Sequence, residues 1–443
     1  MWKEVGLDQV VKRALQKRDF QFDVQAALKG VIFNRLINPG SELSVMEWLE
    51  RDIHFPQGDE LELHHLYRSL DFLVEEKEKI EAGLFNRLLD LFSMDTDVVF
   101  YDTTLVSYRG EGGGNGLVQY SRNKEKEFLV GLMLSRDGFP FAHQVLPGNT
   151  ADVSTVEAVA DKLSERFSVG RCLFVADRGM ISGSNLEYLE DQGRNYVVGV
   201  PARKYKGVRD VVLSTRGRYH SIKDNLRVKE TELKGKRYII CHNPKEAKRV
   251  ELKRSSIVEK LEDEIDGLNP ETQKAHRLLS HPTKSKYLRQ LKDGTLRIDR
   301  GQVREEARFD GKYVLVTNDY DLSSGELATT YRKLKRIEQS FHSLKSLEEV
   351  TPVYHRTPQR MKGHIFVCVL AHLLERALQK RLREEEVDLT VPQAIRELGR
   401  MKAVEMEVDG EPYLFRTEAS KEANQVFKAM HMRPPTRVRE LEE

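Results

Sequence analysis

Short apolar runs alternate with helical segments between residues 98 and 200, and this alternation limits the folds open to the chain. Three apolar runs come first, at 98–101, 128–134 and 139–146, and the last two flank the turn Arg136-Asp137-Gly138. An Asp-Gly pair between two apolar runs is a strong hairpin signal. Helix, strand, helix and strand patterns then follow one another over 155–167, 172–176, 182–189 and 196–200. This order predicts an α/β fold: a mixed sheet with flanking helices on its faces.

Changes of pattern divide the rest of the chain into regions. The N-terminal residues have apolar side chains at helical spacing, which predicts helices. A polar, basic stretch with short alternating segments interrupts the sheet pattern, which resumes with a strand at 312–317. Two helices follow, over 326–347 and 358–382, the second with Thr357 as its expected N-cap and Pro358 at its first position. Beyond residue 390 we expect another helix and a small hairpin.

We therefore expect five regions. Residues 1–95 form a helical N-terminal region that binds DNA. Residues 96–200 and 311–384 form the two parts of the core, and 201–310 form a β-rich basic insertion between them. Residues 385–443 form a C-terminal region for dimerisation.

Charge is distributed unevenly along the chain. Lys and Arg total 72 against 70 Asp and Glu, so the net charge of +2 says little about partners. Between residues 201 and 260, however, there are 18 Lys and Arg against 7 Asp and Glu. A local excess of this size favours a polyanionic partner.

Cysteine usage and hydropathy predict a soluble intracellular protein. Cys172, Cys241 and Cys368 lie far apart, which fits a reducing compartment and ordinary core packing. No apolar run approaches the roughly 20 residues needed to span a bilayer. The N-terminus also lacks the apolar centre of a signal peptide.

Three acidic residues carry most of the functional information. Asp102 and Asp177 each end an apolar run, and Glu338 lies inside a helical stretch. Short right-handed connections can place two such strands side by side and bring both carboxylates to one edge of the sheet. Three carboxylates on a rigid frame suit two divalent cations that activate an attacking oxygen and stabilise a leaving one. The alternative is structural, because an Asp that follows a strand often caps or turns the chain.

The helix that contains Glu338 has one functional face. Tyr331, Glu338 and Lys345 are seven residues apart, so they drift by only about 20° per step and share a face. Leu334 and Phe341 belong to a neighbouring apolar stripe that can dock on a sheet. We expect Glu338 to bind metal while Tyr331 and Lys345 contact phosphates. A solvated helix face with ordinary charge alternation is the alternative.

Basic side chains with interleaved tyrosines mark the insertion as a candidate DNA contact. The first group consists of Arg203, Lys204, Lys206, Arg209, Arg216 and Arg218 around Tyr205 and Tyr219. A second group surrounds Tyr287, with Lys284, Lys286, Arg289 and Lys292. Both suit the phosphate backbone of DNA, and a solvated basic face is the alternative for both.

Three histidines are candidate metal ligands. His143, His355 and His364 have no Cys or His partners at zinc-site spacing. We therefore expect polar packing or DNA contacts for them.

Several segments together resemble the DDE transposases of bacterial and archaeal insertion sequences. They are Val-Val-Phe-Tyr-Asp-Thr-Thr at 98–104, Leu-Pro-Gly-Asn-Thr-Ala-Asp at 146–152, Phe-Val-Ala-Asp-Arg-Gly-Met at 174–180, and the stretch 331–345. More narrowly, the chain is similar to the insertion-sequence-four superfamily, over residues 20 to 435. The runs at 352–356 and 363–366 resemble one branch of that superfamily.

The resemblance implies a fold and a mechanism. The fold is an RNase H-like core with a β-rich insertion between the second Asp and the Glu. Asp102, Asp177 and Glu338 are the implied catalytic and metal-binding residues, holding two magnesium ions that manganese can replace. The implied partners are double-stranded DNA of the transposon ends and target, and a second copy of the chain in the DNA complex. The implied location is the cytoplasm, at the nucleoid of a bacterial or archaeal cell.

Two departures from the family pattern affect the DNA contacts. The family has an Arg three residues after the signature Tyr, whereas this chain has Leu334 there, so the phosphate contact is lost or shifted to Lys335. Arg178, beside the second Asp, offers a further cation. Relatives commonly carry an extra N-terminal segment that binds the element's ends, and the opening at Met1 suggests incomplete end binding. These departures favour an alternative, a transposase remnant that binds DNA without transposing. A separate alternative keeps the fold but makes the chain an RNase H-like nuclease.

Overall fold

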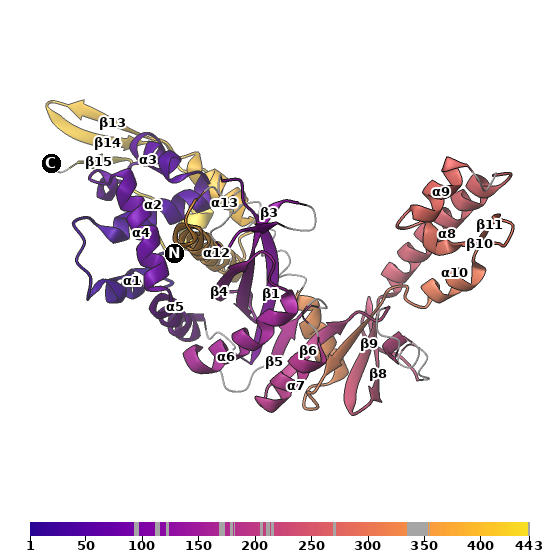
Figure 1. Cartoon of the computed structure of the whole chain (residues 1–443). Helices are drawn as coiled ribbons and strands as arrows, with labels where there is room; N and C mark the ends of the chain where they lie inside the picture. Colours follow the sequence, from indigo (N-terminus) through magenta and orange to yellow (C-terminus); the bar gives the residue numbers. More distant parts are fainter. Residues whose placement is uncertain are drawn as a thin grey trace. The chain divides into compact units, whose positions relative to one another are not determined.

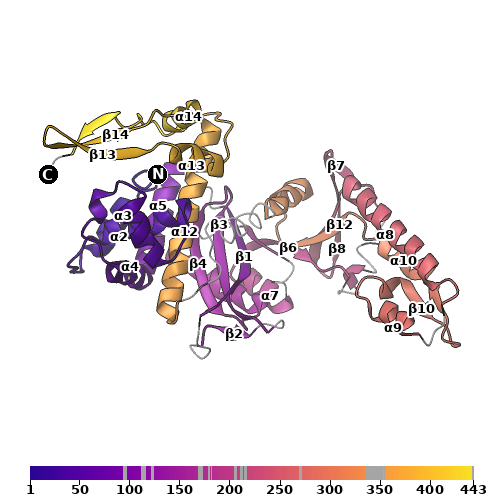
Figure 2. The ribbon, with the colours of Figure 1, turned by 90° about the horizontal axis from the view of Figure 1, so that it is seen from above.

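Two compact units make up the computed structural model (Figures 1 and 2). The first comprises Met1–Cys172 and Leu334–Glu443, and the second comprises Leu173–Lys333. The residues described are 1–92, 97–110, 116–120, 124–167, 173–177, 180, 182–203, 207–209, 213, 217–268, 272–334, 353 and 355–441.

A long buried helix organises the helical part of the first unit. Helix α12 (Pro358–Glu384) packs against α2, α4 and strand β4, and most of its side chains are buried. The other helices of this part are α1 (Leu7–Leu15), α2 (Val24–Ile37), α3 (Glu42–Arg51), the short 3₁₀ turn η1 (Pro56–Gly58), α4 (Leu63–Glu75) and α5 (Lys77–Phe92). The expected cap is confirmed, because the Thr357 hydroxyl accepts a hydrogen bond from the backbone N–H of Arg360.

Glycine at position 363 lets α12 approach α4 closely. A Cβ atom at Gly363 would lie 2.8 Å from the carbonyl oxygen of Leu70 and 2.9 Å from its Cβ. Real Cβ atoms do not approach backbone atoms this closely, so the helix spacing here depends on the missing side chain.

Antiparallel strands form the sheet of the first unit. Strand β3 (Lys126–Ser135) pairs with β1 (Val98–Ser107), β2 (Gln119–Tyr120) and β4 (Pro140–Pro147). The expected Asp-Gly hairpin is confirmed as the β3–β4 turn, where Gly138 has φ 84°. Helix α5 packs on β4 and on α6 (Val156–Phe167), which follows the short turn η2 (Asp152–Thr155).

The C-terminal residues add a small helical cluster and a three-stranded sheet. Helices α13 (Val391–Gly399) and α14 (Lys421–Ala429) bury apolar side chains against the end of α12. Strands β13 (Ala403–Val408), β14 (Glu411–Arg416) and β15 (Val438–Glu440) pair in that order. The expected hairpin is confirmed as β13–β14, whereas α14 and β15 were not predicted from the sequence.

A mixed sheet forms the centre of the second unit. Its strand order is β5 (Leu173–Ala176), β6 (Asn195–Val200), β12 (Lys312–Thr317), β9 (Lys236–His242), β8 (Leu226–Leu233) and β7 (His220–Lys223). β5 and β6 are parallel and the other pairs are antiparallel. Helix α7 (Gly183–Asp191) connects β5 to β6. The expected strands and helices of 172–200 and the strand at 312–317 are thus confirmed.

The insertion contributes both to this sheet and to a separate small core. Its strands β7 to β9 extend the sheet, because β9 pairs directly with β12. Helix α8 (Pro244–Ile265) then leads to α9 (Gln273–Ser280), η5 (Ser285–Tyr287), β10 (Leu288–Gln290), β11 (Leu296–Ile298) and α10 (Arg300–Ala307). These elements bury a cluster that includes Leu261, Leu278 and Tyr287. Strands were expected here, but the three helices were not.

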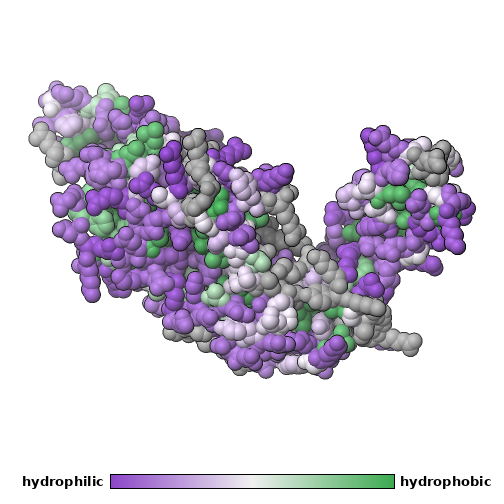
Figure 3. Space-filling view, in the orientation of Figure 1, coloured by the Kyte–Doolittle hydropathy of each residue, from purple (hydrophilic) through white to green (hydrophobic). Residues whose placement is uncertain are grey.

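On the face in Figure 3, hydrophilic residues predominate and hydrophobic ones gather in small groups. None of the helices in the described ranges combines the length and the apolar character needed to cross a bilayer.

Candidate active site

Asp102 lies inside a strand rather than at its end. Strand β1 continues to Ser107, and Asp102 pairs with Leu132 of β3. The expectation of a strand that stops at residue 101 was therefore wrong, because Thr103, Thr104 and Val106 are β-branched residues that suit an extended backbone. The Asp102 side chain is half-buried, and its Oδ1 accepts a hydrogen bond from the Thr103 N–H at 2.9 Å.

Asp177 has the expected position and a specific partner. It directly follows the buried strand β5 and is half-buried. The Tyr331 hydroxyl donates a hydrogen bond to its Oδ1 at 3.2 Å. The second predicted acid and the first residue of the predicted helix signature, 154 residues apart in sequence, are therefore in contact.

A capped helix start fixes the position of Tyr331. Residues 324–334 are helical as far as the described part extends. Ser323 and Glu326 form reciprocal bonds: Glu326 Oε2 accepts from the Ser323 N–H at 2.9 Å, and Ser323 Oγ accepts from the Glu326 N–H at 3.2 Å. This capping box defines the first turn.

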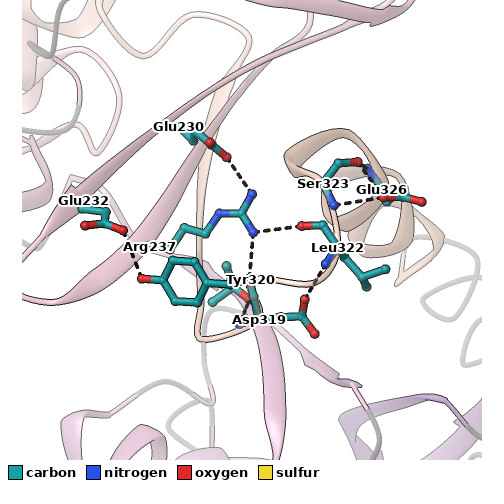
Figure 4. Close-up of polar contacts among 9 residues, drawn as sticks. Glu230, Glu232, Arg237, Asp319, Tyr320, Leu322, Ser323 and Glu326 are labelled. Atoms are coloured by element: carbon teal, nitrogen blue, oxygen red, sulfur yellow. Dashed lines mark hydrogen bonds and ion pairs between the residues drawn. The ribbon is translucent and has the colours of Figure 1, made fainter.

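Arg237 of β9 holds the segment that precedes this helix (Figure 4). Its guanidinium donates to the carbonyl oxygens of Asp319 at 2.7 Å and Leu322 at 2.9 Å, and to Glu230 Oε2 at 2.7 Å. The Asp319 carboxylate in turn accepts from the Leu322 N–H at 2.8 Å. Strand β9 therefore anchors the helix that carries Tyr331, a connection that the sequence did not predict.

Buried aromatic and thiol groups pack behind Tyr331. The Tyr313 ring of β12 stacks on Tyr331 with centroids 5.9 Å apart, and Tyr313 pairs across the sheet with Cys241. Burial raises the pKa of the Cys241 thiol to about 12, and burial likewise raises the pKa of Tyr313. Both groups are therefore neutral at physiological pH and serve as packing behind the Tyr331 ring.

Several other predicted site residues lie in parts of the chain that the structure does not describe. Glu338, Lys335, Lys345, Arg178, Lys204 and Lys206 lie outside the described residues. Asp102 belongs to the first unit and Asp177 to the second, so their proximity stays a prediction. Leu334, at the position of the family's Arg, is buried and packs in the protein interior.

Basic residues of the insertion are partly neutralised by acidic neighbours. Arg203 lies 3.4 Å from Glu306 and stacks over the Phe309 ring, while its side chain stays 60% exposed. The backbone carbonyl of Arg209 accepts a hydrogen bond from Arg308. In the second group, Lys284 pairs with Glu264 and Lys286 with Glu306, which leaves less charge for a partner than the sequence suggested.

Val353 is held beside the end of the strand that carries Asp102. Val353 forms an isolated parallel bridge with Tyr108, next to the end of β1. Its carbonyl accepts from the Arg109 N–H at 3.0 Å, and its N–H donates to the Ser107 carbonyl at 3.2 Å. Val353 is fully buried. The strand that carries Asp102 thus holds the residue fifteen positions after Glu338, which no sequence pattern indicated.

His143 belongs to a buried ion-pair network rather than to a metal site. Its Nδ1 lies 2.8 Å from Glu81 Oε1, and Glu81 Oε2 lies 2.6 Å from Lys77 and 3.0 Å from Arg166. Burial lowers the pKa of His143 to about 4, so the imidazole is neutral at pH 7. Burial alone would raise the pKa of Glu81, but Lys77 and His143 outweigh it and bring the pKa to about 2. The expectation of polar packing for His143 is confirmed.

The described acids suit magnesium by their chemistry. Asp102 and Asp177 offer hard carboxylate oxygens, the ligands that magnesium prefers. Each carboxylate is half-buried and has a hydrogen-bond donor that fixes its orientation, namely the Thr103 N–H and the Tyr331 hydroxyl. Such partners orient metal ligands in known sites.

Comparison with known families identifies the family of the chain. A family model described as a transposase DDE domain matches residues 93–374. The chain belongs to this family. It is thus a transposase, an enzyme that cleaves and transfers DNA, and its chemistry depends on divalent metal as in the family generally. The matched span contains Asp102, Asp177 and Glu338, and the expected α/β fold and DNA partner agree with it.

Two further comparisons add little. The chain is similar to piggyBac transposase, seen by cryo-EM in a synaptic complex with hairpin DNA, at 10% identity and a TM-score of 0.42. The similarity covers 90% of this chain and 76% of the other. No curated protein matches the sequence. So low a similarity supports no inference about individual residues.

Proposed function

We propose that Asp102, Asp177 and Glu338 form one active site that holds two magnesium ions, which manganese can replace. The hydrogen bond from Tyr331 to Asp177 carries this proposal, because it joins the second acid to the helix on which Glu338 is predicted to lie. When bound, the ions supply positive charge that activates the attacking oxygen and stabilises the leaving oxygen.

The proposed reaction has two phosphoryl-transfer steps. Water first attacks the phosphodiester at the transposon end, and the bond to the 3′-oxygen breaks to leave a 3′-hydroxyl. That hydroxyl then attacks a target phosphodiester, forming a new P–O bond as the target's own 3′-oxygen leaves. Tyr331 orients Asp177 throughout, while Lys335, Lys345 and Arg178 contact the DNA backbone phosphates. Double-stranded DNA of the transposon ends and the target is the substrate.

The narrower assignment to the insertion-sequence-four superfamily belongs to this proposal. It is supported by the position of the insertion, which lies between Asp177 and Glu338 and begins with strands β7 to β9. By the same resemblance, the enzyme would act at the nucleoid of a bacterial or archaeal cell.

The basic group Arg203, Lys204, Lys206 and Arg209 is proposed to bind DNA. Arg203 is the described member with the most exposed charge, although Glu306 lies 3.4 Å away. Phosphate binding would compete with this partly screened ion pair, whose own contribution is small. The helical region 1–95 is proposed as a further DNA-binding surface.

A homodimer in the DNA complex is proposed to form through residues 385–443. Strand β13 pairs only with β14 among the described strands and is exposed along its length. Val404, Met406 and Val408 alternate along it, so they share one face, and their exposures are 56%, 52% and 41%. An exposed apolar edge strand is a ready site for pairing with a second copy.

Cleavage of DNA that carries the element's ends tests the active-site proposal. Substrates with the flanking ends would be incubated with magnesium or manganese and the full chain. Asp102→Ala, Asp177→Ala and Glu338→Ala should each abolish nicking at the element boundary while DNA binding persists. Asp224→Asn, in the exposed β7–β8 turn, is the matched control and should cleave at the wild-type rate.

The outcomes separate the alternatives. Boundary nicking that requires all three acids supports the proposal, and nicking retained by any of the three variants refutes that residue's assignment. Binding without nicking by the wild-type chain favours a transposase remnant. Nicking that ignores the element boundary favours an RNase H-like nuclease.

Salt dependence of binding tests the basic group. Arg203→Glu with Arg209→Glu should weaken DNA binding and reduce the slope of log affinity against log salt by about 2, because two phosphate contacts are lost. Arg400→Glu, on an exposed side chain paired with Glu397, serves as a control. An unchanged slope would place the DNA elsewhere.

A further inference from the structure

Three potential metal ligands converge in the helical part of the first unit, and none of them is one of the three acids of the proposed active site. Glu42 is the first residue of α3, His355 precedes the cap of α12, and His364 lies on α12 itself. A ligand atom from each side chain lies within 4.8 Å of those of the other two. His355 Nε2 and Glu42 Oε1 are 3.1 Å apart, and the two imidazole centroids are 5.4 Å apart.

The three side chains are buried and held by rigid elements. Glu42 and His364 are each 7% exposed, and His355 is half-buried. Ser41 caps α3 by accepting from the Ser44 N–H at 3.2 Å. Arg35 of α2 fixes the turn before it by donating to the Gly40 carbonyl at 2.8 Å. The frame is therefore set before any ion binds, as a metal site requires.

An outer layer of polar and aromatic groups surrounds the cluster. The Tyr67 ring of α4 lies edge-on to His355, with centroids 6.2 Å apart. Arg360 lies over that ring at 4.5 Å, and the Asp71 carboxylate interacts electrostatically with both His355 and Arg360. Groups of this kind orient metal-binding histidines.

Ligand type and spacing select the metal. Two imidazoles and one carboxylate form a common zinc set, with water as the fourth ligand. Bonds of about 2.0–2.2 Å in a tetrahedral site separate the ligand atoms by roughly 3.4 Å. The 3.1 Å separation of His355 and Glu42 is near this value, and all three ligand atoms lie within 4.8 Å of one another. Magnesium prefers an all-oxygen set and does not suit this site.

We propose that Glu42, His355 and His364 form a zinc-binding site that ties α3 to the start of α12. This zinc site is distinct from the proposed catalytic metal site. It fixes the chain two residues beyond Val353, which in turn pairs beside the end of the Asp102 strand. Its expected consequence is a more stable first unit.

Zinc content and zinc affinity of the full chain test the proposal. The untagged protein would be analysed for metal by mass spectrometry, then stripped with a chelator and titrated with zinc against a competing chromophoric chelator. The wild type should bind one zinc ion per chain, and added magnesium should not displace it. Glu42→Gln and His364→Ala should weaken that binding about 100-fold or more. His276→Ala, at an exposed histidine of α9, should bind as the wild type does.

A measurement on the wild type keeps the test independent of variant folding. Cobalt added to the stripped wild type should give the intense visible absorption of a tetrahedral site, and zinc should remove it. Zinc should also raise the melting temperature of the wild type more than that of either variant. The proposal is overturned if the stripped wild type gives no such absorption, or if it binds zinc no more tightly than the two variants. DNA cleavage is not the readout, so the active-site proposal can fail separately.

Discussion

Tyr331 donates a hydrogen bond to Asp177 across 3.2 Å, joining a helix to the end of strand β5. A hydrogen bond to a charged carboxylate contributes about 1.5–3 kcal/mol, and loss of it frees the carboxylate to rotate. Tyr331→Phe should therefore slow single-turnover DNA cleavage by roughly 10- to 100-fold, with little change in DNA affinity. The measurement is a rapid-mixing cleavage assay with enzyme in excess.

Tyr313→Phe is the matched control for that experiment. Its ring stacks on Tyr331, but its hydroxyl lies by Cys241 rather than Asp177. Cleavage by Tyr313→Phe should stay within about threefold of the wild type. If Tyr331→Phe cleaves as fast as Tyr313→Phe, the hydrogen bond has no role in positioning Asp177.

Arg237 should control the stability of the helix that carries Tyr331. Its side chain is 10% exposed and donates to two backbone carbonyls in front of the helix. Arg237→Ala leaves these carbonyls without their donor, at a cost of about 2 kcal/mol, so amides of residues 324–334 should exchange roughly 30-fold faster. Hydrogen exchange with mass spectrometry measures this. Arg227→Ala, at an exposed position on β8, should leave the exchange unchanged, and equal protection in both variants would contradict the prediction.

Stability of the first unit should fall as the pH drops from 7 to 5. The pKa of His143 is about 4 in the folded state against an ordinary 6.5, and that of Glu81 is about 2 against 4.5. Both groups bind fewer protons when folded, so acid favours the unfolded state, first through His143 below pH 6.5 and then through Glu81 below pH 4.5. The expected loss between pH 7 and 5 is about 2 kcal/mol, nearly all from His143.

Urea unfolding at several pH values, read from the first unit, measures this loss. His143→Gln removes the group that titrates in this range, and its stability should change little between pH 7 and 5. A wild-type curve that is flat over this range would show that His143 is not held neutral by burial.

Gly363→Ala should push α12 away from α4. The added methyl group meets the Leu70 backbone at 2.8 Å, so the helices must separate at a cost of about 1–3 kcal/mol. This cost exceeds the gain of about 1 kcal/mol that Ala brings to a helix. Thermal unfolding should show net destabilisation. Gly399→Ala, with open space around its Cβ position, should be neutral or slightly stabilising, and equal melting temperatures for the two variants would refute the close-approach argument.

Local patterns predicted most of the secondary structure, because they act over a few residues. The Asp-Gly turn specified the β3–β4 hairpin, and Thr357 with Pro358 specified the start of α12. The prediction for β1 was wrong for the same local reason: Asp disfavours strands, whereas the β-branched residues that follow Asp102 favour them. The helices α8, α9 and α10 were not predicted because their apolar residues are sparse among polar and charged ones.

Functional residues were predictable only where a family motif carried them. The motif around Asp177 and the position of Tyr331 were both evident in the sequence, and the structure shows them in contact. The roles of Arg237 and Val353 were not evident from the sequence. Arg237 donates to the backbone carbonyl of Asp319, and Val353 pairs with the backbone of Tyr108, both far away in sequence. Backbone contacts leave no signature in side-chain chemistry, so no spacing rule reveals them.

The sequence by itself determined the α/β class, the family and the acids that its motifs mark. These follow from local periodicity and from short motifs, which need no knowledge of distant contacts. Only the tertiary structure decided which separated residues meet: His143 with Glu81, and Glu42 with His355 and His364. Pairing across 62 or 313 residues depends on how helices pack, and packing is set by the whole core rather than by any one segment.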